Sequence, residues 1–307
     1  AYNQNNNFQF ISYQSRRWKA FNLIEELDLP GEFYIDRDQM KLYFYPPQGM
    51  NNAKLELSVI GDNMIDITNS QNITFRGITF SRTRGDAVVL TDVSNIDFIG
   101  CRFSDVSQMG IYAKGSKNAV TDAAYWQFQQ IDGSYGCDIR QCRFENIGGS
   151  AIDISGGNVD TLKKSNNVID DNIFYRCSQI NKNNNAIALR GCGNVFTHNN
   201  VSRCAFQGVY YIGNDHTIMY NEIYDVIQET DDCGAIYCGR NVLHQGTVIA
   251  YNYLHDLFST EVLPFGHQTA IYWDDAHCGN TAYNNIIKNV RKNIYTNGID
   301  NTFRDNV

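Results

Sequence analysis

The sequence predicts an all-β fold in which short strands stack as the coils of a solenoid. Three observations predict it: an eight-residue pattern that recurs along the chain, a column of asparagines at one position of that pattern, and the glycine and proline content. The 307 residues include 24 glycines and only 4 prolines. Many short strands joined by glycine- and asparagine-rich turns give this balance, whereas long helices do not.

The eight-residue pattern alternates apolar and polar residues and first appears at 73–80. Further copies occupy 96–103, 137–144, 167–174, 194–201, 216–223, 247–254 and 280–287, and a shortened copy ends the chain at 301–307. Successive copies follow at intervals of 21 to 41 residues, so a basic coil carries insertions of different lengths. Strands this short cannot bury an apolar face alone, but parallel stacking of the coils buries it.

Asparagine recurs at the sixth position of the pattern. The column consists of Asn172, Asn199, Asn221, Asn252, Asn285 and Asn306. A buried asparagine is costly unless its amide is paired, and identical amides at the strand spacing of about 4.8 Å pair from coil to coil. The column therefore predicts a parallel β-helix with an asparagine ladder. Crossover connections between parallel strands are right-handed as a general rule, so we expect a right-handed β-helix.

The first 60 residues lack the repeat. Two aromatic-rich runs at 32–36 and 41–45 flank a polar link and predict a hairpin. We therefore expect a cap or hairpin segment over 1–60 and the β-helix domain over 61–307. Because Val307 interrupts a repeat, we expect the solenoid to continue beyond this sequence.

Composition excludes several function classes. The net charge of −8 argues against nucleic acid and anionic membrane surfaces as partners. No apolar run is long enough to span a membrane. The nine cysteines include no pair at zinc-site spacing, and we predict neither a metal nor a cofactor. Cys101, Cys142, Cys177 and Cys204 fall in apolar columns, where we expect them to be small buried side chains.

Two similar stretches carry paired aspartates. Asp231 and Asp232 come directly before one apolar run, and Asp274 and Asp275 come at the end of another. Aligned by the repeat, the two runs lie on consecutive coils. Two neighbouring carboxylates suit glycoside hydrolysis, where one donates a proton and the other acts as base or nucleophile. We predict Asp232 and Asp274 in these roles, with the other two in support.

Other side chains complete the predicted site. His216, His267 and Arg240 would orient a carboxylate or the substrate, and sugar rings would pack on four aromatic residues. These are Tyr210, Tyr237, Tyr272 and Trp273. The alternative for these residues is structural: aspartate pairs often cap turns, and a lone histidine is commonly a surface or structural side chain.

These stretches resemble glycoside hydrolase family 141, within the pectate-lyase-like β-helix proteins. The resemblance includes the runs at 191–199, 213–223, 232–237, 251–256 and 271–275, together with an upstream segment at 30–47. It implies a secreted, cell-surface or periplasmic enzyme that acts on plant or other complex glycans. It also implies Asp232 and Asp274 as the catalytic pair.

Two other functions remain open at this point. A polysaccharide lyase on the same fold would need a base beside a uronate, supplied by Arg240, Lys288 or Lys292. A non-catalytic module that binds glycans or builds a surface structure would use the exposed tyrosines and asparagines. We expect carbohydrate as the partner of either enzyme and of a glycan-binding module.

Overall fold

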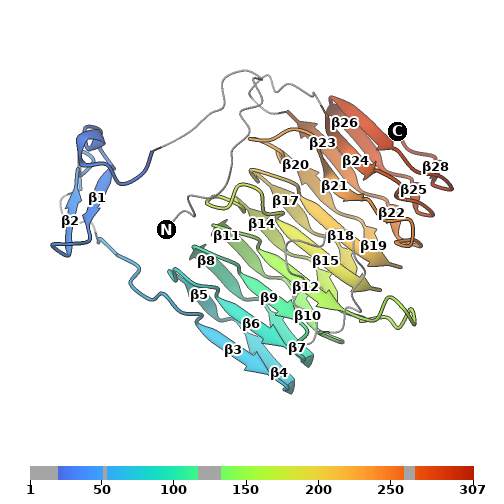
Figure 1. Cartoon of the computed structure of the whole chain (residues 1–307), viewed down its shortest axis with the longest axis horizontal. Coiled ribbons are helices and arrows are strands. Elements are labelled where there is room, and N and C mark those ends of the chain that lie inside the picture. Colours follow the sequence, from blue (N-terminus) through green and yellow to red (C-terminus); the bar gives the residue numbers. More distant parts are fainter. Residues whose placement is uncertain (1–19, 51–53, 117–132, 259–266) are drawn as a thin grey trace, which may run out of the picture. The chain divides into compact units, whose positions relative to one another are not determined.

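The computed structural model describes residues 20–50, 54–116, 133–258 and 267–307, in two compact units, Ala1–Leu57 and Ser58–Val307 (Figure 1). The first unit holds a 3-10 turn, η1 (Ile24–Glu26), and two strands, β1 (Phe33–Asp36) and β2 (Lys41–Phe44). The strands pair antiparallel, which confirms the predicted hairpin.

The second unit is a right-handed parallel β-helix. Among the described residues, three sheets of nine, nine and eight strands run along it. The first sheet consists of β3 (Ile65–Thr68), β6 (Val88–Thr91), β9 (Ile111–Lys114), β12 (Ile152–Gly156), β15 (Ile187–Cys192), β18 (Val209–Asn214), β21 (Cys233–Gly239), β24 (Gln268–Asp274) and β27 (Lys292–Thr296). The second consists of β4 (Gln71–Arg76), β7 (Ser94–Ile99), β10 (Asp138–Arg140), β13 (Val168–Asp170), β16 (Val195–Thr197), β19 (Thr217–Met219), β22 (Val248–Ala250), β25 (Thr281–Tyr283) and β28 (Thr302–Arg304). The third consists of β5 (Thr79–Ser81), β8 (Arg102–Val106), β11 (Arg143–Ile147), β14 (Ile173–Tyr175), β17 (Asn200–Ser202), β20 (Glu222–Tyr224), β23 (Tyr253–Leu257) and β26 (Ile286–Val290).

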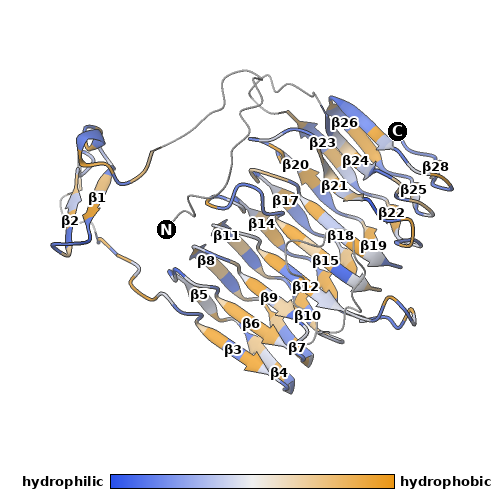
Figure 2. Ribbon diagram, in the orientation of Figure 1, coloured by the Kyte–Doolittle hydropathy of each residue, from blue (hydrophilic) through white to orange (hydrophobic). Residues whose placement is uncertain are grey.

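The core runs along the axis because each coil repeats the register of its neighbour. Hydrophobic residues recur from strand to strand (Figure 2). On the third sheet the rings of Phe103, Phe144 and Phe174 stack at centroid distances of 4.5 and 5.0 Å. Such stacks add about 1 kcal/mol per pair to the area they bury. The alternating pattern thus predicted which side chains point inward.

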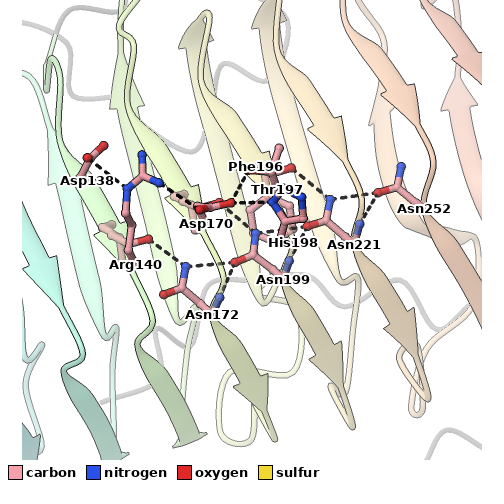
Figure 3. Close-up of polar contacts among 12 residues, drawn as sticks. Asp138, Arg140, Asp170, Asn172, Phe196, Thr197, His198, Asn199, Asn221 and Asn252 are labelled. Atoms are coloured by element: carbon pink, nitrogen blue, oxygen red, sulfur yellow. Dashed lines mark hydrogen bonds and ion pairs between the residues drawn. The ribbon is translucent and has the colours of Figure 1, made fainter.

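The predicted asparagine ladder is confirmed (Figure 3). In each step the side-chain amide donates to the Oδ1 of the next asparagine, at 3.0 Å from Asn172 to Asn199 and 3.2 Å from Asn199 to Asn221. The amide also donates to a backbone carbonyl, and Oδ1 also accepts a backbone N–H. These bonds satisfy the buried amides that would otherwise destabilise the corner.

A second ladder, which the sequence reading missed, occupies the first position of the pattern. It runs through Asn167, Asn194, His216, Thr247, Asn280 and Asn301. His216 takes an asparagine's place: its Nδ1 accepts the N–H of Asn194 at 3.2 Å. The prediction that His216 orients a carboxylate or the substrate is therefore wrong, because the ladder position points into the core and leaves His216 fully buried.

The corner before the first ladder has a left-handed backbone in coil after coil. His198, Tyr220 and Tyr251 have φ angles of 55°, 60° and 56°, although none is glycine. A left-handed non-glycine residue costs of order 1 kcal/mol, so the ladder and the flanking strands must hold the turn. This corner sets the direction from the second to the third sheet.

All nine cysteines lie buried as free thiols. This confirms the prediction for Cys101, Cys142, Cys177 and Cys204, which pack in the core. No helix among the described residues is long and apolar enough to cross a membrane.

Candidate functional site

The two aspartate pairs lie on the neighbouring strands β21 and β24 of the first sheet. Tyr237 pairs with Tyr272 in register, as the repeat alignment predicts. Asp232 directly precedes β21, and Asp274 is the last residue of β24. The two pairs therefore lie at opposite ends of adjacent strands, with the two tyrosines between them.

The two tyrosine hydroxyls cross between the coils. Tyr272, from the second motif, donates to Oδ1 of Asp232 at 3.0 Å. Tyr237, from the first motif, donates to Oδ2 of Asp274 at 2.8 Å. The two rings meet edge to face with centroids 5.3 Å apart. Each motif thus positions the carboxylate of the other, which couples the two ends of the site.

Asp274 is the sheltered member of the pair, with 8% of its surface exposed. Besides the Tyr237 hydroxyl, it accepts the N–H of Asp275 at 2.8 Å. Nε of Arg240 lies 3.6 Å from Asp274 Oδ2 and 3.7 Å from Asp275 Oδ2. Two donors and a guanidinium thus surround this carboxylate.

Asp232 is the open member, with 54% of its side chain exposed. His267 Nδ1 lies 3.8 Å from its Oδ1. Asp231 braces the turn, since its Oδ1 accepts the backbone N–H of Asp232 at 2.8 Å and that of His267 at 2.6 Å. The predicted supporting residues Asp231 and His267 therefore do contact this end, and Arg240 and Asp275 contact the other.

The two carboxylates are not in direct contact. Cys233, the residue after Asp232, pairs with Gln268, and Asp274 pairs with Gly239. Asp232 and Asp274 are thus seven positions apart in register, and the two tyrosines that donate to them lie between.

Both tyrosines are held as proton donors. Burial, and then the hydrogen bond to Asp274, raises the pKa of Tyr237 well above its ordinary value. Burial, and then the charges of Asp274 and Asp232, does the same to the pKa of Tyr272. Both carboxylates therefore act electrostatically on the Tyr272 hydroxyl, which places them around one shared polar region.

Two of the predicted sugar platforms are wrong. Trp273 is fully buried in the hydrophobic core, since it alternates with the outward Tyr272 and Asp274 along β24. Tyr272 faces outward but is only 3% exposed, because its ring lies edge to face between those of Tyr237 and Tyr295. Its role is to position Asp232. Tyr210 and Tyr237 remain partly exposed.

The tyrosine column is longer than predicted. Tyr210, Tyr237, Tyr272 and Tyr295 occupy one outward position of β18, β21, β24 and β27. Tyr295 was missed, although Ile294 and Tyr295 repeat the Ile-Tyr step of the two aspartate motifs. The column forms a continuous aromatic face along the first sheet.

An ion pair on the same face was also missed. Arg190 of β15 donates through Nε and Nη2 to Oδ1 and Oδ2 of Asp153 of β12, at 2.7 and 2.9 Å. Its guanidinium carbon lies 5.5 Å from the ring centroid of Tyr210. The sequence did contain a signal for this pair: each of the two strands, otherwise apolar, has one charged residue at an outward position.

Histidine, cysteine and carboxylate side chains do not gather into a metal site in the part of the chain that the structure describes. The site thus consists of carboxylates, phenols, a guanidinium and an imidazole. This donor set suits proton transfer and the binding of hydroxyl groups.

Comparisons with known proteins agree on the architecture. The profile described as "Right handed beta helix region" matches residues 63–221, just over half of the chain. A solved structure titled "Glycoside hydrolase" is 15% identical with a TM-score of 0.67 and covers 93% of this chain. The A-module of the mannuronan C-5 epimerase AlgE6 from Azotobacter vinelandii is 12% identical with a TM-score of 0.51 and covers 77%.

The chain spans 57% of the glycoside hydrolase structure and 65% of the epimerase module. A search of the curated proteins finds no match. At these identities the structural likeness concerns the fold alone.

Proposed function

We propose, from the premise that this chain belongs to the right-handed β-helix region family, that it is a glycoside hydrolase of the family 141 type. Its substrate would be a complex extracellular polysaccharide, so the protein would act in the secreted, cell-surface or periplasmic space. The observation that supports the proposal best is the crossed pair of hydrogen bonds, in which Tyr237 positions Asp274 and Tyr272 positions Asp232.

The surroundings suggest different roles for the two carboxylates. Asp274 receives two hydrogen bonds and lies beside Arg240, so we assign it the ionised role, as the base that activates water. Asp232 is open to solvent at the other end, where a departing sugar can take its proton. His267 and Tyr272 hold its orientation.

The separation of the pair favours inversion. Retaining enzymes need carboxyl groups about 5 Å apart, whereas inverting enzymes leave room for water at roughly 6.5–9.5 Å. The opposite strand ends and the intervening tyrosine rings argue against the shorter distance. We therefore propose that the product has the inverted anomeric configuration.

A lyase mechanism is less well supported. Arg240 lies within 4 Å of two carboxylates, and a guanidinium is a poor base because it does not lose its proton in proteins. Lys292 lies over the ring of Tyr295, with its Nζ 5.5 Å from the ring centroid. Lys288 belongs to β26 of the third sheet, whereas the aspartates lie at the ends of strands of the first sheet.

The test is to replace each aspartate separately. We expect Asp274→Asn to lower kcat/KM on the cognate glycan by about 10³-fold, because it removes the base. Asp232→Asn should lose as much on the natural glycan but retain more activity on an aryl glycoside, whose leaving group needs no proton. Proton NMR of the first product gives the anomeric configuration.

The matched control is Asp138→Asn, on the outer face of the second sheet. Asp138 also contacts an arginine, Arg140, but lies away from the tyrosine column. It should retain full activity. Full activity in both Asp232→Asn and Asp274→Asn, with an unchanged melting temperature, would exclude the proposed pair.

A further inference from the structure

The Arg190–Asp153 pair faces outward on the same sheet as the aspartates. Both guanidinium–carboxylate contacts are at hydrogen-bond distance, 2.7 and 2.9 Å. Only 21% of the Arg190 side chain and 9% of that of Asp153 are exposed. The two side chains thus form a sheltered, fixed arrangement of charge on the surface of the helix rather than in its core.

This pair is continuous with the candidate site through the tyrosine column. The guanidinium of Arg190 lies over Tyr210, and the Tyr210 ring stacks on Tyr237 at 6.2 Å. Tyr237 in turn donates to Asp274. A chain of direct contacts therefore leads from Asp153 to Asp274 along the outer face of the first sheet.

Fold stability does not account for the pair. Sheltering an ion pair from water carries a desolvation penalty, and apolar residues in its place are often as stabilising or more so. Neighbouring coils do place alanine or tyrosine at the outward position of Asp153, namely Ala188 and Tyr210. Asp153 thus stands between uncharged residues of the neighbouring coils, Tyr112 and Ala188.

The pair has the chemistry to bind hydroxyl groups. A guanidinium has five N–H donors, and two bonds to Asp153 leave others to donate. Each carboxylate oxygen of Asp153 likewise keeps acceptor capacity. Adjacent sugar hydroxyls both donate and accept, and a sugar ring can pack against the neighbouring Tyr210.

The charges on this face favour an uncharged sugar. Arg190 is neutralised by Asp153, and Arg240 lies between Asp274 and Asp275. A uronate would thus approach cations whose charge is already balanced, close to carboxylates that repel it. A neutral sugar meets no such repulsion.

We infer that Arg190, Asp153 and Tyr210 form a binding subsite for an uncharged polysaccharide, which lies across the coils along the helix axis. The inference rests on the proposed function and names its substrate class. Arg190 and Asp274 belong to strands three steps apart in the sheet order β15, β18, β21 and β24. At the usual strand spacing this is about 14 Å, or roughly three sugar units of an extended chain.

The test measures how affinity depends on glycan length. Calorimetric titration of Asp274→Asn protein with xylohexaose, mannohexaose and cellohexaose, and with the corresponding disaccharides, avoids cleavage during the measurement. We expect at least one hexasaccharide to bind more tightly than its disaccharide. The added changes Arg190→Gln and Asp153→Asn together should reduce that length advantage about tenfold or more. This double change removes both charges and leaves no unpaired ion behind.

The matched control is Arg140→Gln with Asp170→Asn, in the same background. Arg140 also pairs with carboxylates, at 3.0 Å from Asp170, but on the second sheet (Figure 3). It should leave the length advantage unchanged. The inference is overturned if no neutral hexasaccharide binds, if hexagalacturonate binds more tightly than all of them, or if both double variants have the same effect.

A parallel hydrolysis assay on the protein without the Asp274→Asn change separates the two proposals. If hydrolysis requires Asp274 but the length advantage does not depend on Arg190, the hydrolase proposal is supported and the subsite is excluded. If binding depends on Arg190 but no hydrolysis occurs, the subsite is supported and the proposed activity is excluded.

Discussion

Three histidine side chains, His216, His244 and His277, lie inside the solenoid rather than on its surface. Burial lowers the pKa of His216 and of His277 to about 4, and burial with the nearby imidazoles lowers that of His244 to about 3. His277 Nε2 meets the Tyr211 hydroxyl at 3.2 Å. The folded protein therefore holds neutral imidazoles at pH values where an unfolded chain would protonate them.

These histidines predict that acid destabilises the fold. Because the folded pKa of His216 is about 4 and the unfolded value is 6.5, its contribution is complete above pH 6.5. It is lost as pH falls toward 4, by about 3 kcal/mol. His216→Asn, which continues the second ladder with its usual residue, should reduce the fall in unfolding free energy between pH 7 and 4.5. Urea titrations at both pH values measure it.

His198→Asn is the control for that experiment. His198 lies exposed at the second sheet's corner, so its replacement leaves the buried imidazoles unchanged. The fall in unfolding free energy between pH 7 and 4.5 should then change much less than in His216→Asn. An equal reduction in both variants would show that the buried position of His216 is not the cause.

At the scale of the element, the ladder side chains contribute more to the stability of the corner than the strand side chains around them. The side chain of Asn221 takes part in four hydrogen bonds: two donated, to Asn252 and the carbonyl of Phe196, and two accepted from Asn199. Removing its side chain leaves donors and acceptors unpaired inside the corner. Such unmet groups cost more than the bonds themselves contribute.

We therefore expect Asn221→Ala to lower the free energy of unfolding by about 3 kcal/mol. The control is Asn181→Ala, whose exposed side chain donates to Gln108 at 3.2 Å and should cost less than about 1 kcal/mol. Urea unfolding followed by circular dichroism compares them. Equal losses would contradict a special role for the ladder.

The same scale shows what a sequence can predict. Alternation with period two and a repeated asparagine were enough for the strands, the first ladder and the register of Tyr237 with Tyr272. The same alternation, applied consistently, also assigns Trp273 to the core, since it lies between two outward residues. The crossing of the hydroxyls to the opposite aspartates depends on side-chain rotamers, which no pattern in the sequence specifies.

The second ladder, which contains a histidine, could not be predicted from the repeated asparagine for a different reason. His216 and Thr247 replace asparagine because a hydrogen-bond acceptor at that position is what the neighbouring N–H requires. A search for identical residues overlooks such exchanges. Arg190 and Asp153 were missed because they are 37 residues apart, and only stacking of the coils brings them together.

Across the whole molecule, one continuous core excludes solvent along the described solenoid. Its cysteines come from many coils, and all nine are buried. Burial raises the pKa of Cys142 and of Cys233 to about 12 and that of Cys137 to about 11. Their thiolates, the reactive forms, are thus rare at neutral pH.

We expect fewer than one thiol per chain to react with an aromatic disulfide reagent under native conditions, and nine after denaturation. Absorbance of the released thiolate counts them. Asn146→Cys, at an exposed position, serves as the positive control and should add one rapidly reacting thiol. Rapid reaction of several native thiols in the unaltered protein would contradict a closed core, and fewer than nine after denaturation would indicate disulfides.

The left-handed corner has a consequence for how such a chain changes length. Since His198, Tyr220 and Tyr251 turn the backbone alike, the chain returns to an equivalent point once per coil. The coil is thus a module: duplicating or deleting a whole one leaves both flanking registers compatible, whereas a fractional change does not. Each added module would lengthen the outer face by one strand spacing, about 4.8 Å. Such a molecule can act as a ruler, in which the number of coils determines how much of an extended ligand it holds.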